Sequence, residues 1–134
     1  MSFTLDVEAF CDKAKKNPEI VMRKVSMKLF SAIIMGSPVD TGRFRNNWFA
    51  NFGPTPSSEI TAYTGKQGTA AISRVSKVIT ESRGLAWTEL TLTNNLPYAQ
   101  RLEYGWSQQA PQGMVRTNVA RFNTLLEEEA AKVR

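Results

Sequence analysis

The sequence predicts an α+β domain in which a small, mostly antiparallel sheet packs against a long N-terminal helix and a C-terminal helix. The hydrophobic periodicity gives the order helix, helix, strand, strand, helix, strand, helix, helix. A Thr-rich segment over residues 85–93 places alternate side chains on two faces, as a strand does. The length of 134 residues and the hydrophobic fraction of 42% fit a single domain over residues 1–134.

The first part of the chain is expected to be helical. Residues 5–16 form a short amphipathic pattern. Asn17, Pro18 and Glu19 are a helix start signal, with a cap, a proline at the first position and an acid at the positive end of the helix dipole. The helix from Pro18 to about Met35 becomes apolar almost all round in its second half. We therefore expect it to be the core helix, with Gly36 as its stop.

Residues 37–48, called the corner below, connect this helix to a strand expected over residues 46–52. Its proline excludes the helical conformation from the preceding serine, and its aspartate and threonine are natural N-caps. Its glycine permits a left-handed bend, and its tryptophan supplies an apolar anchor. The residues with these structural roles are Pro38, Asp40, Thr41, Gly42 and Trp48.

The middle of the chain is predicted to contain a hairpin and a second helix. Gly, Pro and Ser predict flexible loops near residues 53–58 and 65–68, around a strand expected over residues 60–64. These are either ordinary surface loops or loops that become ordered on assembly. Residues 69–82 fit an amphipathic helix, which Gly84 ends.

The last third of the chain is predicted to contain a short helix, a loop and a final helix. The short helix covers Pro97 to Glu103, with Tyr98, Leu102 and Tyr104 packed inward. Trp106 in the following loop either folds back onto the core or is exposed as an interface anchor. The final helix begins at a proline, and its apolar stripe is Met114 or Val115, Val119, Phe122, Leu126 and Ala130.

Catalysis is not expected from this composition. The chain has no His, and its one Cys, Cys11, is expected to be a small buried residue. No catalytic triad, phosphate loop or zinc motif is present in the sequence. Glu103 is expected to form a structural salt bridge or a backbone hydrogen bond. The sequence therefore predicts a protein that is not an enzyme, with no catalytic residue, cofactor, metal or small-molecule substrate.

The net charge of +5 favours an anionic partner. Arg43, Phe44 and Arg45 interleave basic and aromatic side chains, as single-strand binders do, although a buried Phe between two cations would look the same. A small basic nucleic-acid-binding module is therefore the alternative function. No apolar run is long enough to span a membrane, and the first residues do not look like a signal peptide.

Three segments, in order, resemble one protein family. They are "SPVDTG" followed by a basic residue and Trp over residues 37–48, "PYA" with "E-x-G" over residues 97–105, and "QAPQGMVR" over residues 109–116. Together they resemble the minor tail proteins of long-tailed bacteriophages known as tail completion or head–tail joining (neck) proteins. The second segment carries the family-motif residues Pro97, Tyr98, Ala99, Glu103 and Gly105. A small residue is expected after the glycine, where this chain has Trp106.

This resemblance implies a structural protein of the virion, made and assembled in the cytoplasm of the bacterial host. It implies a homo-oligomeric ring, usually of six copies, that completes or caps the head-proximal end of the tail. Tail-tube, terminator and head-connector proteins would be its neighbours, and DNA in the channel would lie close by. Arg43, Arg45 and Trp106 are the side chains expected to contact neighbours. The sequence does not separate a tail terminator from a completion or neck protein.

Overall fold

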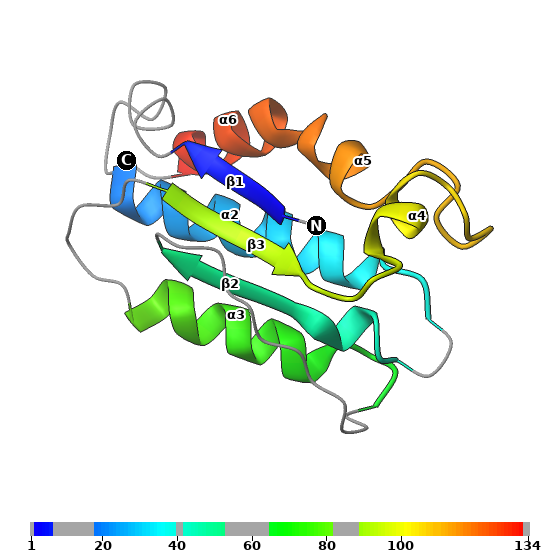
Figure 1. Ribbon diagram of the computed structural model, residues 1–134. Helices are drawn as coiled ribbons and strands as arrows, with labels where there is room; N and C mark the ends of the chain where they lie inside the picture. The colour runs from blue at the N-terminus through cyan, green and yellow to red at the C-terminus, as the bar shows by residue number, and fades with distance from the viewer. Residues whose placement is uncertain (1, 7–17, 40–41, 53–64, 82–88, 133–134) are drawn as a thin grey trace.

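The computed structural model describes residues 2–6, 18–39, 42–52, 65–81 and 89–132 (Figure 1). The elements are, in order, β1 (Ser2–Asp6), α2 (Pro18–Met35), the 3₁₀ turn η1 (Arg45–Asn47), β2 (Trp48–Phe52), α3 (Thr69–Glu81), β3 (Glu89–Asn94), α4 (Ala99–Glu103), α5 (Val115–Val119) and α6 (Phe122–Lys132). The strands form one sheet in the order β1-β3-β2, and both pairings are antiparallel. The expected α+β class and antiparallel sheet are confirmed.

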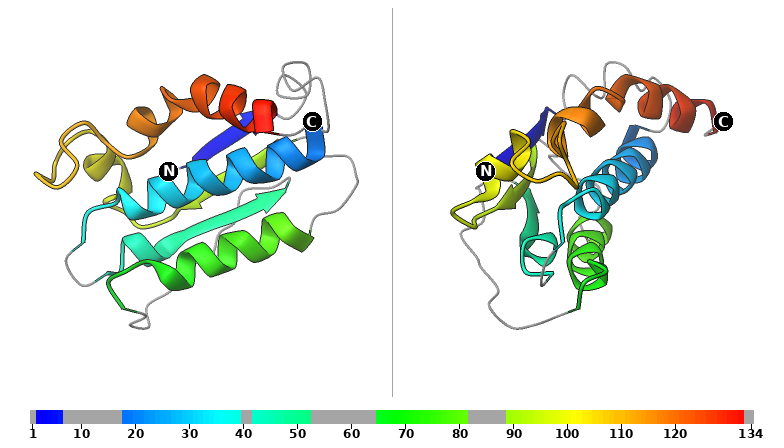
Figure 2. Two further views of the ribbon diagram at one scale, coloured as in Figure 1. Left: turned by 180° about the vertical axis from the view of Figure 1, so that it is seen from behind. Right: turned by 90° about the vertical axis from the view of Figure 1, so that its right-hand side faces the viewer.

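The structure has two layers. The sheet is one layer, and α2, α3 and α6 lie together on one of its faces (Figure 2). Helix α2 is the middle helix of that layer, since it contacts both α3 and α6. Its buried residues follow the spacing of a helix that faces a core, and they are Met22, Val25, Ser26, Leu29, Phe30, Ile33 and Ile34. Helix α2 therefore has the bounds and the core position that its sequence predicts.

The first element of the chain is a strand, so the helix expected over residues 5–16 is wrong at Leu5 and Asp6. The remainder of that helix, with Cys11, lies outside the described residues. In β1, Phe3 is opposite Leu92 and Leu5 is opposite Leu90. Phe3 and Leu5 are two positions apart, which is the period of a strand. Pairing with β3 favours this strand pattern over the short helical pattern that begins at residue 5.

The apolar face of the sheet is built from β2 and β3. Trp48, Ala50, Leu90 and Leu92 are all buried, and Ala50 is opposite Leu92 in the antiparallel register. Leu90 and Leu92 thus share one face of the sheet, as the alternation over this segment predicts. The strand expected over residues 46–52 begins only at Trp48, because residues 45–47 form the turn η1. Residues 85–88 lie outside the described part of the chain, as do residues 53–64.

Helix α3 covers the expected range and packs against β2, an edge strand of the sheet. Its buried positions are Ala71, Val75 and Ile79. Arg74 donates from Nη2 to the carbonyl oxygens of Asn46, at 2.7 Å, and Trp48, at 2.8 Å. Its guanidinium also lies 4.0 Å from the centre of the Phe49 ring. Burial lowers the pKa of Arg74, and the side chain occupies carbonyl groups that a foreign strand would otherwise pair with.

The single final helix expected from the sequence is two helices. Residues 111–113 form a turn, α5 begins at Val115, and a second break lies between α5 and α6. At this break the amide of Arg121 bonds the carbonyl of Asn118, three positions earlier. Met114 is buried, and Val115 and Phe122 pack against the core, as the predicted stripe has them. Leu125, which the stripe did not include, is buried as well.

Candidate assembly interface

The corner turns on Gly42. Its φ of 92° is the left-handed conformation that the sequence predicts for this glycine. A Cβ atom at this position would lie 2.0 Å from the carbonyl oxygen of Gly65. The side-chain amide of Asn46 joins the two turns, because it donates to the carbonyl oxygens of Gly42, at 3.0 Å, and Gly65, at 2.8 Å. Residues 65–68, which the composition marks as a flexible loop, are therefore bound to the corner.

Trp48 anchors the corner to the end of α2. The indole is fully buried, and its Nε1–H donates to the hydroxyl of Ser37 at 2.9 Å. That hydroxyl in turn donates to the carbonyl oxygen of Ile33 at 2.8 Å. The polar edge of a large core residue is thus satisfied through one serine. Asp40 and Thr41 lie outside the described residues, so their capping roles stay predictions.

Arg45 supports the fold of its own chain, and its assignment to an interface stays a prediction. Its guanidinium donates to the carbonyl oxygens of Met35 at 2.8 Å, Ser37 at 3.0 Å and Lys66 at 3.2 Å. A cation at the C-terminal end of a helix is favourable because the last carbonyl groups are partly negative. Partial burial lowers the pKa of this side chain. Arg43, two residues earlier, is exposed.

Helix α4 ends in a Schellman motif, and this motif sets the position of Trp106. Gly105 has a φ of 90°, its amide bonds the carbonyl of Leu102, and the Trp106 amide bonds the carbonyl of Arg101. The indole is 74% exposed, with the Arg101 guanidinium 5.6 Å from the ring centre. The tryptophan is therefore exposed and not folded back onto the core, and its role as an interface anchor stays a prediction. We call residues 104–109 the aromatic loop.

Tyr104 is also exposed, contrary to the expectation that it packs inward. It sits just after α4, and 72% of its surface is accessible. The guanidinium of Arg116 lies 4.8 Å from the centre of its ring. Tyr98 and Leu102, which were expected to pack inward with Tyr104, do pack against the core. Ala99 and Glu103 of the same segment are buried.

Glu103 holds the aromatic loop against α5, in the structural role that the sequence predicts. Its carboxylate is buried and accepts the backbone amides of Met114, Val115 and Arg116, at 2.8 to 2.9 Å. The same carboxylate pairs with the Arg116 guanidinium at 3.2 Å. Three amide bonds at the start of a helix satisfy most of its free N–H groups, here from a distant segment. They fix the two ends of the turn between α4 and α5.

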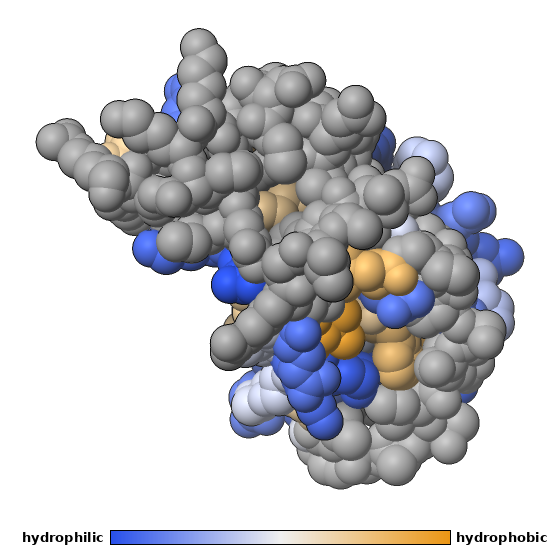
Figure 3. Space-filling view, turned by 90° about the vertical axis from the view of Figure 1, so that its left-hand side faces the viewer, coloured by the Kyte–Doolittle hydropathy of each residue, from blue (hydrophilic) through white to orange (hydrophobic). Residues whose placement is uncertain are grey.

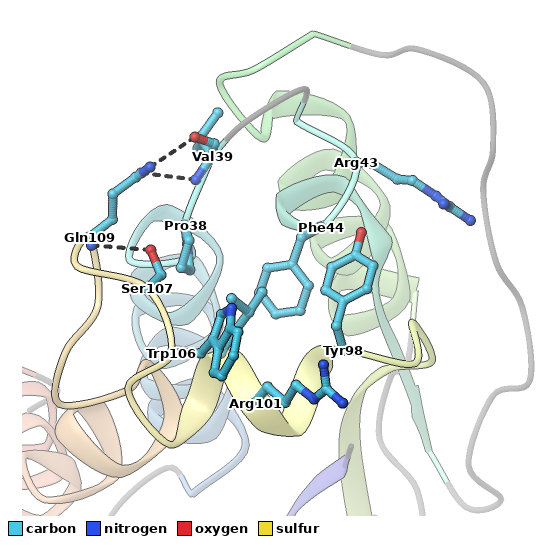
Figure 4. A pocket seen from close by; sticks show the side chains of 10 residues that line it. Pro38, Val39, Arg43, Phe44, Tyr98, Arg101, Trp106, Ser107 and Gln109 are labelled. Atoms are coloured by element: carbon cyan, nitrogen blue, oxygen red, sulfur yellow. Dashed lines mark hydrogen bonds between the residues drawn. The ribbon is translucent and has the colours of Figure 1, made fainter.

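The corner, α4 and the aromatic loop together line a groove of about 470 Å³ (Figure 4). The corner contributes Pro38, Val39, Arg43 and Phe44, helix α4 and its preceding residue contribute Tyr98, Arg101 and Leu102, and the loop contributes Trp106, Ser107 and Gln109. Two of the three segments on which the family resemblance rests thus meet at this groove. The third segment begins at its rim with Gln109.

Two sets of contacts hold the walls of the groove in place. The side-chain amide of Gln109 both donates to and accepts from the backbone of Val39, each at 2.9 Å, as a neighbouring strand would (Figure 4). At the base, Phe44 packs against Trp48 with ring centres 5.8 Å apart and against Tyr98 at 6.0 Å. The groove is therefore preformed in the single chain.

The predicted site residues divide between surface and support. Arg43 and Trp106 lie at the groove, whereas Arg45, Gly42 and Trp48 hold the backbone behind it. Of the family-motif residues, Tyr98 lines the groove, Pro97 is exposed, and Ala99, Glu103 and Gly105 fix the turn. Sequence reasoning missed Arg101 and Gln109. The spacing of Arg101 five positions before Trp106, across a helix-ending glycine, is the signal that could have identified the first of them.

The chemistry of the groove favours binding. Its ten lining residues include two arginines and three aromatic side chains, and no carboxylate. Within the described ranges, no three His, Cys, Asp or Glu side chains come close enough to hold a metal ion. None of the helices that the structure describes is long and apolar enough to cross a bilayer. Comparison of the chain with family models, curated proteins and solved structures finds no match.

Proposed function

We propose that this chain is a structural assembly protein of a bacteriophage virion, located at the head–tail junction. In this role it completes or caps the head-proximal end of the tail as one subunit of a ring. The proposal rests on the resemblance over residues 37–116. One structural observation supports it: the corner and the α4 segment, far apart in the sequence, form a single preformed groove whose rim carries an exposed tryptophan.

The groove has the residue types that dominate protein contacts. Trp, Tyr and Arg are the side chains most enriched among residues whose truncation costs the most binding energy. Trp106 and Tyr104 are each more than 70% exposed, and each lies beside an arginine. Their backbone is held by a helix-ending motif and by the Glu103 cap, so that little conformational entropy is lost when a neighbour binds.

The proposed partners follow from the resemblance. The ring contains six copies, with tail-tube or terminator subunits on one side and head-connector subunits on the other. The chain is made in the cytoplasm of the host and remains in the virion. It acts in stoichiometric amounts, by binding and not by catalysis, and needs no cofactor.

The decisive experiment is electron microscopy of a lysate from phage that lack only this gene. Filled heads beside separate tails of correct length are expected for a completion or neck protein. Overlong tails would assign the chain to a terminator role. Normal infectious particles would refute the proposal.

Complementation with point variants links this phenotype to the groove. A Trp106→Ser variant is expected to fold normally and to leave heads and tails unjoined. The matched control is Met35→Ser. Among the described residues, the exposed large hydrophobic side chains are Met35, Tyr104 and Trp106, and of these only Met35 lies outside the aromatic loop. The control is expected to restore infectious particles. Full rescue by the tryptophan variant would remove this side chain from the interface.

The second candidate is a small nucleic-acid-binding module. Arg43, Arg101 and Trp106 combine positive charge with an exposed aromatic face, as proteins that bind single strands do. Binding of this kind weakens steeply and linearly on a log–log plot as salt rises. Titration of fluorescent single-stranded DNA at several salt concentrations separates this candidate from the first. A nucleic-acid-binding module requires salt-dependent affinity for DNA, whereas an assembly protein whose groove binds another protein does not.

A further inference from the structure

The groove carries positive charge on exposed side chains. Arg43 and Arg101 are exposed, and none of the ten lining residues is acidic. The Arg101 guanidinium lies near the Trp106 ring, which places a cation and a large apolar surface side by side. A partner that fits here carries negative charge on a firm surface with some apolar area next to it.

The exposed face of α6 has this character. Thr124, Glu127 and Glu128 are exposed and are spaced three and four residues apart, so that they share one face of the helix. The helix carries three Glu and one Lys, from its sequence FNTLLEEEAAK. Its opposite side contacts α2. The acidic face is therefore turned away from α2.

The groove and α6 lie at different ends of the molecule. Helices α5 and α6 run from the side of α4 toward the opposite end, in both the front and the rear view (Figures 1 and 2). At that far end, a small hydrophobic group lies next to hydrophilic residues of the described part (Figure 3). The α6 of one molecule thus cannot enter its own groove, whereas the α6 of a neighbour can.

We propose that the groove of one copy receives the acidic face of α6, at Glu127 and Glu128, from a second copy of the chain. This inference rests on the proposed function, because it names the contact that builds the ring. A contact between two different surfaces is head-to-tail, and repetition of such a contact gives a closed ring when the rotation between neighbours closes. Arg101 and Arg43 meet the carboxylates, and Trp106 covers the adjacent helix surface.

The contact should be weak between free molecules and sensitive to salt. Exposed ion pairs each contribute little, and ionic screening reduces them further. A ring held in this way forms where the local concentration is high, as on the end of a completed tail. Assembly in solution should accordingly need concentrated protein at low ionic strength.

Directed cross-linking between two variants of the full chain tests the contact. In a Cys11→Ser background, a Ser107→Cys variant is mixed with a Thr124→Cys variant at low salt and oxidised. Ser107 lines the groove, and Thr124 lies on the acidic face of α6. The control pairs Thr124→Cys with Gln67→Cys, an exposed position outside the groove. About a tenfold excess of the first cross-link is expected, equivalent to about 1.4 kcal/mol of preference.

Charge reversal then identifies the side chains. Arg101→Glu in the groove partner, or Glu127→Lys with Glu128→Lys in the α6 partner, should each remove the excess. Combining the two reversed partners should restore it, because the signs match again. A Lys77→Glu change on the exposed face of α3 should have no effect. Thermal melting of each variant shows that the chain is folded.

Each result has one meaning. Equal cross-linking from Ser107→Cys and Gln67→Cys overturns the inference, as does a pair of reversed partners that fails to recover when both are folded. Neither result bears on the gene-deletion phenotype, so the proposed function stands or falls on that separate experiment. If cross-linking is strong but phage that lack the gene still form normal particles, the contact between copies exists and its assignment to a virion is wrong.

Discussion

Two turns border the groove, and both depend on a glycine with nearly the same φ. Gly42 in the corner has a φ of 92°, and Gly105 in the aromatic loop has a φ of 90°. After Gly42 the chain turns inward, and Trp48 becomes fully buried. After Gly105 the chain turns outward, and Trp106 is 74% exposed. The same backbone conformation thus delivers one tryptophan to the core and another to the surface.

The difference lies in the partners that surround each turn. The corner is bonded on several sides, because Asn46 ties it to Gly65 and Asn94 donates to the carbonyl of Phe44 at 2.9 Å. The aromatic loop is bonded mainly at its ends, through Glu103 and Gln109. A turn enclosed by polar partners supports a fold, whereas a turn held only at its ends can present side chains to a neighbour.

Valine substitution of the two glycines should break the corner more severely than the loop. In Gly42→Val the new Cβ meets the Gly65 carbonyl oxygen at 2.0 Å, and we expect a loss of roughly 4 kcal/mol in unfolding free energy from clash and strain together. In Gly105→Val the Cβ meets the Pro111 carbonyl oxygen at 2.6 Å, and we expect about 2 kcal/mol, because an exposed loop can shift. Urea unfolding measures both. Equal losses would contradict the distinction.

Removing the charge of Glu103 should loosen the loop without reaching the corner. Glu103→Gln keeps the size of the side chain but gives up charge-assisted bonds to three amides, and it turns an amide donor toward some of them. We expect a loss of roughly 2 kcal/mol in unfolding free energy. Hydrogen exchange should show faster exchange of the amides of Met114, Val115 and Arg116, with the amides of the corner unchanged. Faster exchange in both regions would mean that the two turns open together.

Substitution of the two arginines of the corner should have clearly different effects on the free energy of unfolding. Arg45→Met removes bonds to three carbonyl oxygens and should cost about 1.5 kcal/mol. Arg43→Met changes an exposed side chain and should stay within about 0.5 kcal/mol. Thermal melting of the single variants is the measurement. A double charge reversal of both arginines is not a clean test of assembly, since the Arg45 half acts on stability.

The parts of the fold that the sequence predicts are those specified by local signals. The sequence around α2 carries a proline at its first position and a glycine after its last, and the sequence of α3 has a regular apolar spacing. Strand β1 was missed because five residues carry little local preference and their partners in β3 lie more than eighty positions later in the sequence. The start of α5 at Val115, four positions after the expected proline, was missed because the cap of this helix comes from Glu103, on a different element.

The candidate site was predictable in the same measure. Gly42 and Trp48 were assigned correctly, because a left-handed turn and a buried aromatic are local properties. The role of Arg45 depends on carbonyl groups at the end of α2 and on Lys66, whose proximity no spacing reveals. The exposure of Trp106 depends on the bonds that end α4. The groove itself is a product of tertiary structure, since its walls come from segments that only the fold brings together.

The central position of β3 gives the folding of this chain an order in time. Strand β3 pairs with strands on both sides, yet it is the last of the three to be synthesised. Until it leaves the ribosome, β1 and β2 lack their partner in this sheet, and such non-local pairing is slow. The corner is also incomplete until then, because the side chain of Asn94 donates to the carbonyl of Phe44, fifty positions earlier in the chain. A nascent chain therefore offers no finished groove until β3 has been synthesised and has paired with both of its neighbours.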